Sequence, residues 1–569
     1  HPRYRMVDSC AAEFAAVTPY YYSTYEGGSV YSGVDYVPGL AASIKQRIAV
    51  IGSGPIRIGQ GIEFDYGCVH AAGAIQDLGH EAIIINNNPE TVSTDFDTSD
   101  RLYFDPLTLE SVSEILLRED ANGILLQFGG QTAINLALPL SNELPHLSSM
   151  GLELVMEGTS PESVDEASDR ERFEEFALRC DLRMPDGATA TSPEGVRHAA
   201  NEIGYPVLVR PSYVLGGRGM EILANYKQLE SYMRDAYLSS DRPLLIDKYL
   251  GNAMELDVDA VCDGEDVLVG AVMEHLEEAG IHSGDSTCFI PPQNVPDEIL
   301  EQVHEWTRVI GLELGIRGCY NIQFAIHDGL LYVLEVNPRG SRTFPFVAKS
   351  TGIPLARIAA RVALGERLCD LEIPEPQTDA VCVKAPVFPF IKLRGLDPAP
   401  GPEMKSTGEV MGSHVRASAA YLKARLATEI PVPTEGGVYI TVKDEDKYAM
   451  IPLAERLKEM GFTIFATRGT SRVLRGVGEL EVETCYRIAE GRSPDSLDLM
   501  RQGKIQLVIN TPRSTGGAVL DGNMMRRLAV ELNIPFVTTM AGARMEVEAV
   551  QEALLGIPEP RLLDIKSLK

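Results

Sequence analysis

Long apolar runs are missing from this 569-residue sequence. No stretch reaches the ~18 uncharged apolar residues that a membrane-spanning helix needs, so we expect none. The first residues, HPRYRMVDSCAAEF, hold no apolar segment behind a basic one, and a secretory signal peptide is not expected either. The chain also begins without an initiator Met, and we interpret it as a fragment or processed half of a larger protein.

Cysteine and basic residues are also scarce. The nine cysteines are scattered singly without a CxxC pair, so we expect neither a disulfide framework nor a zinc site, and a reducing, cytoplasmic compartment fits. Lys and Arg number 51 against 81 Asp and Glu, a net charge of −30, which argues against general nucleic-acid binding. Local arginine clusters can still hold phosphate groups in an acidic protein. Adaptation to salt is a second explanation of the acidic bias.

What the chain does contain is an alternation of strands and helices, which begins at Arg47. The β-rich runs RIAVIG, EAIIINN and GILLQFGG are separated by helical stretches, and this pattern predicts βαβ units with a parallel sheet. From about Ser168 hairpins appear, one turning at residues 263–264 and one near residues 328–329, as is typical of an α+β domain. After the Pro- and Gly-rich stretch TEIPVPTEGG, strands and helices alternate again.

These changes predict a multidomain chain of α/β and α+β class. The length alone favours three or four domains. The predicted segments are residues 1–46, the tail of a preceding domain plus a linker; 47–167, with the first parallel sheet; 168–430, with the hairpins; and 431–569, a small α/β unit.

A glycine-rich turn, IAVIGSGPIRIGQG, follows the first strand and raises the question of a dinucleotide. The spacing is Gly52-x-Gly54-x4-Gly59, which is not GxGxxG. The next strand ends in asparagines at 86–88, where a dinucleotide fold places an acidic residue for the ribose. We therefore favour a tight strand–helix turn over NAD binding.

A second glycine cluster lies in VRPSYVLGGRGMEI. Arg210 ends a predicted strand, and the loop after it carries Gly216, Gly217 and Gly219. Glycines let backbone N–H groups approach phosphate oxygens, and the arginine adds fixed positive charge. The stretch lacks the GxxxxGK[ST] pattern, and a surface turn is the alternative explanation.

The stretch NIQFAIHDGLLYVLEVNPRGSRTF has the strongest chemical signal. Glu335 and Asn337 are two residues apart on a predicted strand and so share a face, and Arg339 and Arg342 follow the strand end. Carboxylate and amide oxygens are hard ligands that suit Mg²⁺ bound through substrate phosphates. The alternative is a solvated strand end with an ordinary Glu–Arg pair.

Hairpin register decides whether Gln323, on the preceding strand, joins this face. A two-residue turn would put Gln323 and Glu335 on opposite faces, whereas a three-residue loop, 327–329, would put them on the same face. We predict the three-residue loop.

The polar stretch EHLEEAGIHSGDST offers His282 as a donor to a nucleotide, although a lone loop histidine is often only exposed. Together the four stretches predict Mg-ATP with arginines on the transferred phosphate, a site that works by positioning and charge neutralisation. No Ser/His/Asp or Cys/His arrangement is evident from spacing.

Long motifs resemble the large subunit of carbamoyl phosphate synthetase over essentially the whole chain, but only its C-terminal half. They are GIEFDYGCVHAAGAI, NNNPETVSTDFDTSDRLYF, VRPSYVLGGRGMEI, EHLEEAGIHSGDS and EVNPRGSRTFPFVAK. The resemblance implies the end of an oligomerisation domain, a Rossmann-like pre-ATP-grasp domain, an ATP-grasp domain and a methylglyoxal-synthase-like regulatory domain. The glycine turn belongs to the pre-ATP-grasp domain, so the implied nucleotide is ATP in the later domain.

The same resemblance implies phosphorylation of carbamate by ATP, the last step of carbamoyl phosphate synthesis for pyrimidine and arginine biosynthesis. Mg²⁺ or Mn²⁺ is the implied metal, with K⁺ as a further candidate ion. The implied partners are the N-terminal half of the large subunit and a glutamine amidotransferase subunit, and a homo-oligomer is left open. Two rivals are another ATP-grasp ligase, such as a biotin carboxylase, and a non-enzymatic regulatory or assembly subunit.

Site residues follow from the matching motifs. Arg210, Gly216 and Gly217 are expected at phosphates, Lys248 and Leu250 at adenine, Glu255 at the ribose, and Gly280, Ile281, His282 and Ser283 around the nucleotide; Gln323, Glu335 and Asn337 match metal ligands, and Arg339 and Arg342 match arginines at the transferred phosphoryl group.

An allosteric effector, a nucleotide or ornithine, is implied for the C-terminal domain. Open α/β sheets bind ligands where their strands end. Polar residues at predicted strand ends there are Lys443, Thr467, Thr470, Asn510 and Thr511. Glu277 and Asp285 are candidates for holding a cationic effector such as ornithine.

Overall fold

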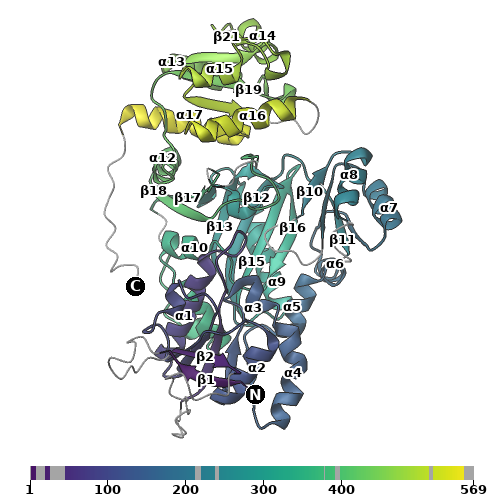
Figure 1. The fold of residues 1–569 in the computed structure, drawn as a ribbon, viewed down its shortest axis with the longest axis vertical. Coiled ribbons are helices and arrows are strands. Elements are labelled where there is room, and N and C mark those ends of the chain that lie inside the picture. Colours follow the sequence, from purple (N-terminus) through teal and green to yellow (C-terminus); the bar gives the residue numbers. More distant parts are fainter. Residues whose placement is uncertain are drawn as a thin grey trace. The chain divides into compact units, whose positions relative to one another are not determined.

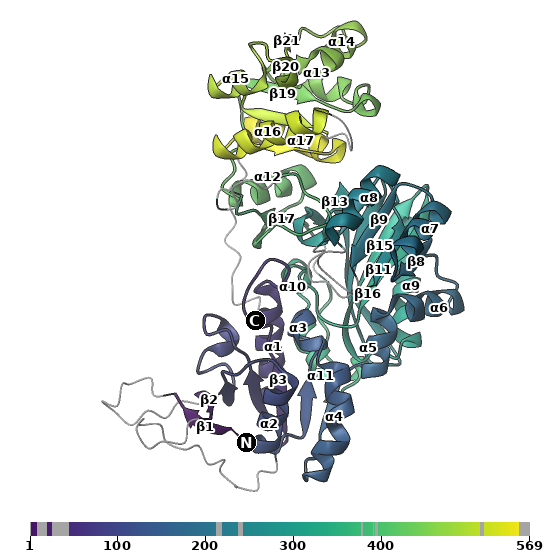
Figure 2. The same cartoon turned by 45° about the vertical axis from the view of Figure 1, so that its right-hand side comes forward.

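The computed structural model describes residues 2–7, 20–25, 45–211, 219–236, 243–376, 379–390, 392, 397–511 and 517–556. Figures 1 and 2 draw the chain as a ribbon coloured along the sequence. The chain divides into two compact units. Unit 1 comprises His1–Thr189, Leu256–Val272 and Val295–Gln377, and unit 2 comprises Ala190–Glu255, Met273–Asn294 and Thr378–Lys569. Among the described residues, no helix is both long enough and apolar enough to cross a membrane.

Unit 1 contains the predicted parallel sheet, which confirms its α/β class. The sheet has seven strands in the order β1-β2-β5-β4-β3-β6-β7, and only β1 runs antiparallel to its neighbour. The β-rich run before the glycine turn is wholly buried in this sheet from Ile48 to Ile51. The strands are β1 (Arg3–Met6), β2 (Tyr20–Thr24), β3 (Arg47–Ile51), β4 (Glu81–Ile85), β5 (Arg101–Tyr103), β6 (Gly123–Leu125) and β7 (Val155–Glu157).

Three of the helices that follow these strands, α2, α5 and α6, begin at side-chain caps. Thr108 accepts a hydrogen bond from the Ser111 N–H at the start of α2, and Ser160 does the same for Ser163 at the start of α5. Apolar residues of α2 and α4 pack on the sheet to form its core. The helices are α1 (Glu63–Asp77), α2 (Leu109–Glu119), α3 (Gly130–Ile134), α4 (Ala137–Ser149), α5 (Pro161–Ser168) and α6 (Arg170–Arg179).

The predicted hairpins form a second sheet. In unit 1 its strand order is β16-β15-β12, and β13 begins there beside β12; in unit 2 the order is β13-β14-β17-β18. In unit 1, α9 packs on β15 and β16, and α11 packs on β15; in unit 2, α12 packs on β17 and β18. These elements are β12 (Met254–Cys262), β13 (Val267–Glu278), β14 (Cys288–Ile290), β15 (Gly318–His327), β16 (Leu330–Asn337), β17 (Val381–Val387), β18 (Gly408–His414), α9 (Asp297–Glu313), α10 (Phe344–Thr351), α11 (Leu355–Ala363) and α12 (Ala417–Ala427).

A smaller sheet precedes these hairpins along the chain. Its four strands have the order β10-β9-β11-β8, and β9 pairs antiparallel with both neighbours. The elements are β8 (Gly187–Ala190), β9 (Val207–Pro211), β10 (Glu221–Leu223), β11 (Leu244–Lys248), α7 (Pro193–Ile203) and α8 (Tyr226–Ala236).

The C-terminal part of unit 2 is the second predicted α/β unit. Its five strands run parallel in the order β21-β20-β19-β22-β23. One apolar core gathers residues of α13, α14 and α17, and a second gathers residues of α15 and α16, so helices cover both faces (Figure 1). The elements are β19 (Gly437–Thr441), β20 (Thr463–Thr467), β21 (Glu483–Cys485), β22 (Leu507–Asn510), β23 (Phe536–Val537), α13 (Ile451–Glu459), α14 (Arg468–Gly476), α15 (Ser496–Arg501), α16 (Gly517–Glu531) and α17 (Met540–Leu555).

Candidate functional site

The β15–β16 hairpin brings Gln323 and Glu335 into direct opposition. The predicted three-residue loop is wrong, because His327 pairs with Leu330 and only Asp328 and Gly329 form the turn, both with positive φ, 50° and 74°. Such a turn, continued regularly, would oppose Gln323 to residue 334.

A bulge corrects the register. Phe324 pairs with Val333 whereas Gln323 pairs with Glu335, so Leu334 is the extra residue on β16. Gln323 and Glu335 therefore share a face, as predicted, although for a different reason.

The next pair along the same face is Asn321 with Asn337. The Asn337 amide N–H donates to Glu335 Oε1 at 2.6 Å, and its Oδ1 accepts from Arg339 Nη2 at 3.0 Å. Because an amide oxygen has two lone pairs, Asn337 can keep the arginine bond and still ligate a cation. The described residues contain no group of three or more His, Cys, Asp or Glu that could hold a metal, so a metal in unit 1 would rely on amide oxygens beside one carboxylate. That hard oxygen set fits Mg²⁺ or Mn²⁺.

Both predicted arginines lie in the loop after β16 and reach the first sheet's domain within unit 1. Arg339 Nε donates to Gln131 Oε1 at 3.2 Å, and its guanidinium lies 5.8 Å from the centre of the Phe64 ring. Burial lowers the pKa of Arg339, an effect that the nearby Glu335 charge opposes. Arg342 Nη2 lies 3.3 Å from Glu63 Oε1, at the start of α1. Unit 1 thus brings together all five residues predicted at the metal and the transferred phosphoryl group.

The glycine-rich turn before α1 packs against Asn86. Gly54 N–H donates to Asn86 Oδ1 at 3.0 Å, and a Cβ on Gly52 would collide with the Asn86 side chain. This contact accounts for an asparagine at the place where a dinucleotide-binding domain has an acid.

Unit 2 brings together most of the residues predicted around the nucleotide. Glu255 Oε1 accepts from the Gly280 N–H at 3.2 Å, and Glu255 Oε2 lies 3.4 Å from His275 Nδ1. His282 N–H donates to the Gly401 carbonyl at 2.9 Å, and the Ser283 carbonyl accepts from Lys384 Nζ at 3.2 Å. The loop carrying Gly280, Ile281, His282 and Ser283 is therefore held at both ends.

Asp285 is buried, with 1% of its surface exposed, and is the main anchor of this loop. Its oxygens accept from the backbone N–H groups of Lys405 and Ser406 at 2.8 and 2.9 Å. Glu277, the other residue considered for a cationic effector, accepts from the Thr287 N–H at 2.6 Å, and its burial raises its pKa to about 7.

Two further predicted nucleotide contacts, Arg210 and Lys248, lie on the smaller sheet, and Leu250 follows its strand β11. Arg210 pairs with Leu245 across β9 and β11, and Leu250 is buried. Lys248 Nζ donates to the carbonyls of Gly204 at 2.8 Å and Tyr205 at 3.4 Å, so its side chain is tied to the turn before β9. Gly216 and Gly217 fall outside the described residues.

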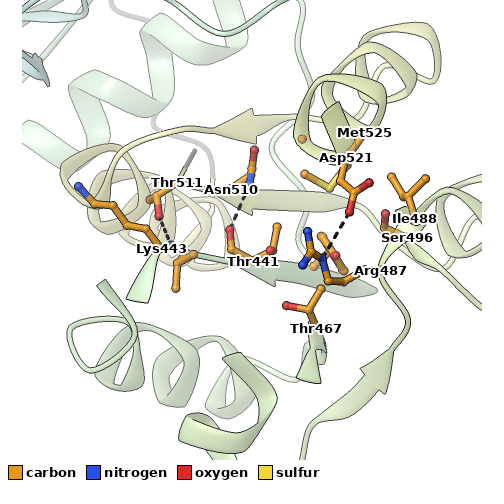
Figure 3. A pocket seen from close by; sticks show the side chains of 13 residues that line it. Thr441, Lys443, Thr467, Arg487, Ile488, Ser496, Asn510, Thr511, Asp521 and Met525 are labelled. Atoms are coloured by element: carbon orange, nitrogen blue, oxygen red, sulfur yellow. Dashed lines mark hydrogen bonds and ion pairs between the residues drawn. The ribbon is translucent and has the colours of Figure 1, made fainter. Parts of the chain in front are cut away.

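A pocket opens at the C-terminal edge of the last sheet, where β19, β20 and β22 end (Figure 3). Four predicted effector residues line it: Lys443, Thr467, Asn510 and Thr511. The fifth, Thr470, is 1% exposed within α14 and does not line the pocket. Asn510 Nδ2 donates to the Thr441 carbonyl at 3.2 Å, and Thr511 Oγ1 accepts from the Lys443 N–H at 2.9 Å.

An ion pair that sequence reasoning missed lies in the same pocket. Arg487 Nε lies 3.4 Å from Asp521 Oδ2 (Figure 3). Arg487 follows the very short strand β21, and Asp521 lies on α16. A three-residue strand gives no periodic signal, and a helix residue cannot be assigned to a strand-end site from spacing alone.

Comparison with known sequences identifies the family. Three family models match: carbamoyl phosphate synthase preATP-grasp domain over residues 44–166, carbamoyl-phosphate synthase L chain, ATP binding domain over 169–371, and MGS-like domain over 449–538. The carbamoyl phosphate synthase large chain, C-terminal section, of Methanocaldococcus jannaschii is 49% identical over 98% of this chain and 90% of the relative. The chain belongs to the carbamoyl phosphate synthase large-chain family.

Other family members are about twice as long. The large chain of Methanothrix thermoacetophila is 51% identical over 99% of this chain but 51% of the relative, so the chain spans about half the length of that member. The resemblance found in the motifs, and its restriction to the C-terminal half, are confirmed.

Solved structures confirm the ATP-grasp fold of this family member. An N5-carboxyaminoimidazole ribonucleotide synthetase in complex with ADP has a TM-score of 0.52 at 14% identity and covers 68% of this chain and 96% of that chain. The biotin carboxylase domain of Hydrogenobacter thermophilus 2-oxoglutarate carboxylase, with MgADP and bicarbonate, has a TM-score of 0.51 at 17% identity and covers 77% and 99%. At such identities the likeness shows the fold, and family membership rests on the sequence relatives.

Proposed function

We propose that this chain phosphorylates carbamate with ATP, giving carbamoyl phosphate and ADP, as the last step of carbamoyl phosphate synthesis for pyrimidine and arginine biosynthesis. The observation that carries the proposal is the opposition of Gln323 and Glu335, with two arginines in the loop that follows. Family membership supports the same reaction.

In the proposed reaction a carbamate oxygen attacks the γ-phosphorus in line with the departing ADP oxygen. Arg339 and Arg342 place positive charge at the transferred phosphoryl group, where it offsets charge that develops in the transition state. Glu335, Gln323 and Asn337 would hold Mg²⁺ or Mn²⁺, which would neutralise phosphate oxygens. The hydrogen bond that Arg339 donates to Gln131 and the ion pair of Arg342 with Glu63 fix both guanidinium groups in advance of binding.

For the nucleotide itself, we assign recognition to unit 2. Glu255 and the anchored loop of Gly280 to Ser283 supply acceptors and backbone donors for ribose and base, with Arg210 at phosphates and Leu250 at adenine. Because its ammonium bonds two backbone carbonyls, we assign Lys248 a backbone role at adenine. A K⁺ ion is a further candidate ligand of this enzyme.

Supply of carbamate defines the proposed partners. Carbamate is unstable in water, so the full enzyme needs the N-terminal half and a glutamine amidotransferase subunit to make and shield it. The Methanothrix relative, of which this chain covers 51%, supports a further half as a partner. The eight cysteines in the described residues are all free, which supports a cytoplasmic setting.

We further propose that the Figure 3 pocket binds an anionic nucleotide effector. Lys443 and Arg487 line it among threonine hydroxyls, a set suited to phosphate and sugar. A chain of contacts within unit 2 supports regulation: Arg526 donates to Asn510 of the pocket at 2.6 Å and binds both oxygens of Asp397 at 3.0 and 2.7 Å.

The contacts continue to the nucleotide loop. Lys405 Nζ donates to the Asp397 carbonyl at 3.2 Å, and Lys405 N–H donates to Asp285 at 2.8 Å. Loss or rearrangement of the pocket contact at Asn510 would thereby reach the loop of His282.

The test of the catalytic proposal is the partial back-reaction, ATP formed from ADP and carbamoyl phosphate with Mg²⁺. Wild type should form ATP, and Glu335→Gln should lower kcat by about 100-fold or more. Asp328→Asn, at the exposed tip of the same hairpin, is the matched control and should behave as wild type. No ATP from folded protein that binds ADP, alone or with its partner subunits added, would support the regulatory-subunit rival.

A further inference from the structure

One buried carboxylate near the candidate metal ligands has no role in the reaction proposed above. Asp259, on β12, is 0% exposed. One oxygen accepts from Asn321 Nδ2 at 3.0 Å and the other from Thr343 Oγ1 at 2.7 Å, and the Ser341 hydroxyl also hydrogen-bonds to it. All four residues belong to unit 1.

The two hydroxyls flank Arg342 in the sequence. Ser341 Oγ lies 2.8 Å from Thr343 Oγ1 and accepts the Thr343 N–H at 3.1 Å, so the two side chains form one hydrogen-bonded unit with the carboxylate. Ser341 and Thr343 are 8% and 4% exposed, which leaves the shape of this loop dependent on protein partners rather than water.

The Oδ1 atom of Asp259 contacts the strand that carries the candidate metal ligand Gln323. Its partner Asn321 is the cross-strand neighbour of Asn337 and lies two residues before Gln323. Asp257, 2% exposed, also lies near the Asn321 amide, with Nδ2 3.4 Å from its Oδ1. One buried carboxylate thus contacts both the strand that carries a metal-ligand candidate and the loop that carries the arginines.

This arrangement is costly if its purpose is only packing. A buried charge lowers stability unless each of its hydrogen-bond sites is filled, and a buried apolar side chain of similar volume is often as stable or more stable. Burial raises the pKa of Asp259 to about 6, so at neutral pH the group is ionised at a cost in stability. Retaining the carboxylate makes sense where a fixed geometry of its partners matters.

We propose that Asp259 is a positioning residue for phosphoryl transfer, holding Arg342 in place through the hydroxyls of Ser341 and Thr343. The proposal rests on the function proposed above. Asp259 does not touch substrate; it acts by limiting the motion of a guanidinium whose placement within about 1 Å decides catalysis.

The test uses the full chain with Asp259→Asn and, as a milder variant, Thr343→Val, which leaves the carboxylate but removes one partner. Asp263→Asn is the matched control, because Asp263 is a buried carboxylate directly after the same strand and accepts N–H groups of Glu265, Asp266 and Leu368. Two readouts are compared: kcat and KM of the back-reaction, and deuterium exchange of the peptide spanning 338–347.

Asp259→Asn should lower kcat by roughly 10- to 100-fold with KM for ADP changed less than about threefold, and should speed exchange in the loop. Thr343→Val should do the same more weakly, and Thr343→Ser should restore wild-type behaviour. The double variant should lose less than the product of the two single losses, because both substitutions break one network. The control should leave loop exchange and kcat unchanged.

Unchanged loop exchange and kcat in Asp259→Asn would overturn the proposal, as would equal losses in Asp263→Asn. If Asp259→Asn does not fold, the Thr343 variants decide by the same criteria. An inactive wild type would contradict the proposed function, while loop exchange would still show whether Asp259 holds the loop.

Discussion

Gln323 on β15 and Glu335 on β16 are direct cross-strand partners. Direct antiparallel partners have Cβ atoms about 4.5–5.5 Å apart, close enough for an amide oxygen and a carboxylate to share one cation. The bulge at Leu334 creates this pairing, because a regular hairpin closed by Asp328 and Gly329 would turn Glu335 to the other face.

The pairing of Gln323 with Glu335 predicts how a metal ion would change the stability of a variant that carries a second carboxylate at position 323. In Gln323→Glu two like charges stand opposite each other, so without metal the melting temperature should fall by a few degrees. Added Mg²⁺ or Mn²⁺ should raise the melting temperature of this variant more than that of wild type, since a ligand that binds the folded state stabilises it. Thermal unfolding with and without the metal measures both effects.

Gln323→Met is the control for this prediction. It keeps the volume but removes the amide oxygen, and the metal-dependent shift should shrink below that of wild type. Equal metal shifts in all three proteins would place the cation elsewhere.

The sheets were predictable because their signals are local. Runs such as Ile48–Ile51 combine β-branched residues with turn residues at their ends, and the C-terminal strands repeat at regular spacing. Pocket residues Asn510 and Thr511 were found for the same reason, since strand ends of a parallel sheet meet at one edge.

The features that the sequence did not predict depend on packing between residues far apart in the chain. Leu334 is an apolar strand residue like Val333 before it, and nothing local marks it as the bulge. The place of Thr470 near a strand end predicts a pocket residue, but Thr470 is buried within α14. Asp259 is part of an alternating strand, and its partner Thr343 is 84 residues away. Arg487 meets Asp521 only because α16 packs beside the end of a short strand.

The pH dependence of stability should distinguish two buried carboxylates, Asp259 on β12 and Asp263 directly after this strand. The folded-state pKa of Asp259 is raised from 3.8 to about 6 by burial, so its contribution to stability is lost as pH rises through that range. The pKa of Asp263 is lowered, because N–H groups of Asp266, Leu368 and Glu265 outweigh its desolvation, so its contribution is lost as pH falls.

Removing each carboxylate should therefore affect stability over a different pH range. From pH 4.5 to 7.5, Asp259→Asn should gain stability relative to wild type, by about 2 kcal/mol. Over the same interval the stability of Asp263→Asn relative to wild type should stay nearly constant, because the lowered pKa of Asp263 confines its effect to the range below about pH 3.8. Urea unfolding at both pH values measures the differences, and parallel trends in the two variants would contradict the assignment.

A buried ion pair between α12 and α17 should be sensitive to the loss of one partner. Glu546 is 0% exposed and accepts from Arg425 Nε at 3.2 Å and from the Tyr421 hydroxyl at 2.8 Å. Glu546→Gln leaves the buried arginine charge unpaired and should lower the free energy of unfolding by roughly 3–5 kcal/mol. Replacing both Arg425 and Glu546 by apolar residues should restore most of the loss.

The control for this prediction lies on the same helix. Glu548 is 3.9 Å from Arg456, and both side chains are about one-third exposed, at 34% and 37%. Glu548→Gln should change stability by less than about 1 kcal/mol, since exposed pairs contribute little. Urea unfolding compares the variants, and equal losses would mean that burial does not set the strength of the Arg425 pair.

Arg526 should decide whether the effector pocket and the nucleotide loop are coupled. Its guanidinium joins Asn510 of the pocket to Asp397, and lysine cannot make these three bonds with one planar fork. In wild type, a bound non-hydrolysable ATP analogue should change the Kd of a nucleoside monophosphate by roughly 5- to 150-fold, measured by calorimetry. In Arg526→Lys that ratio should fall close to one while each ligand still binds.

Arg527→Lys, at an exposed neighbouring position, makes the same change without these contacts and should keep the wild-type ratio. Because coupling is reciprocal, the effector must change ATP-analogue affinity by the same factor; a wild-type ratio retained in Arg526→Lys would mean that the coupling does not pass through this arginine.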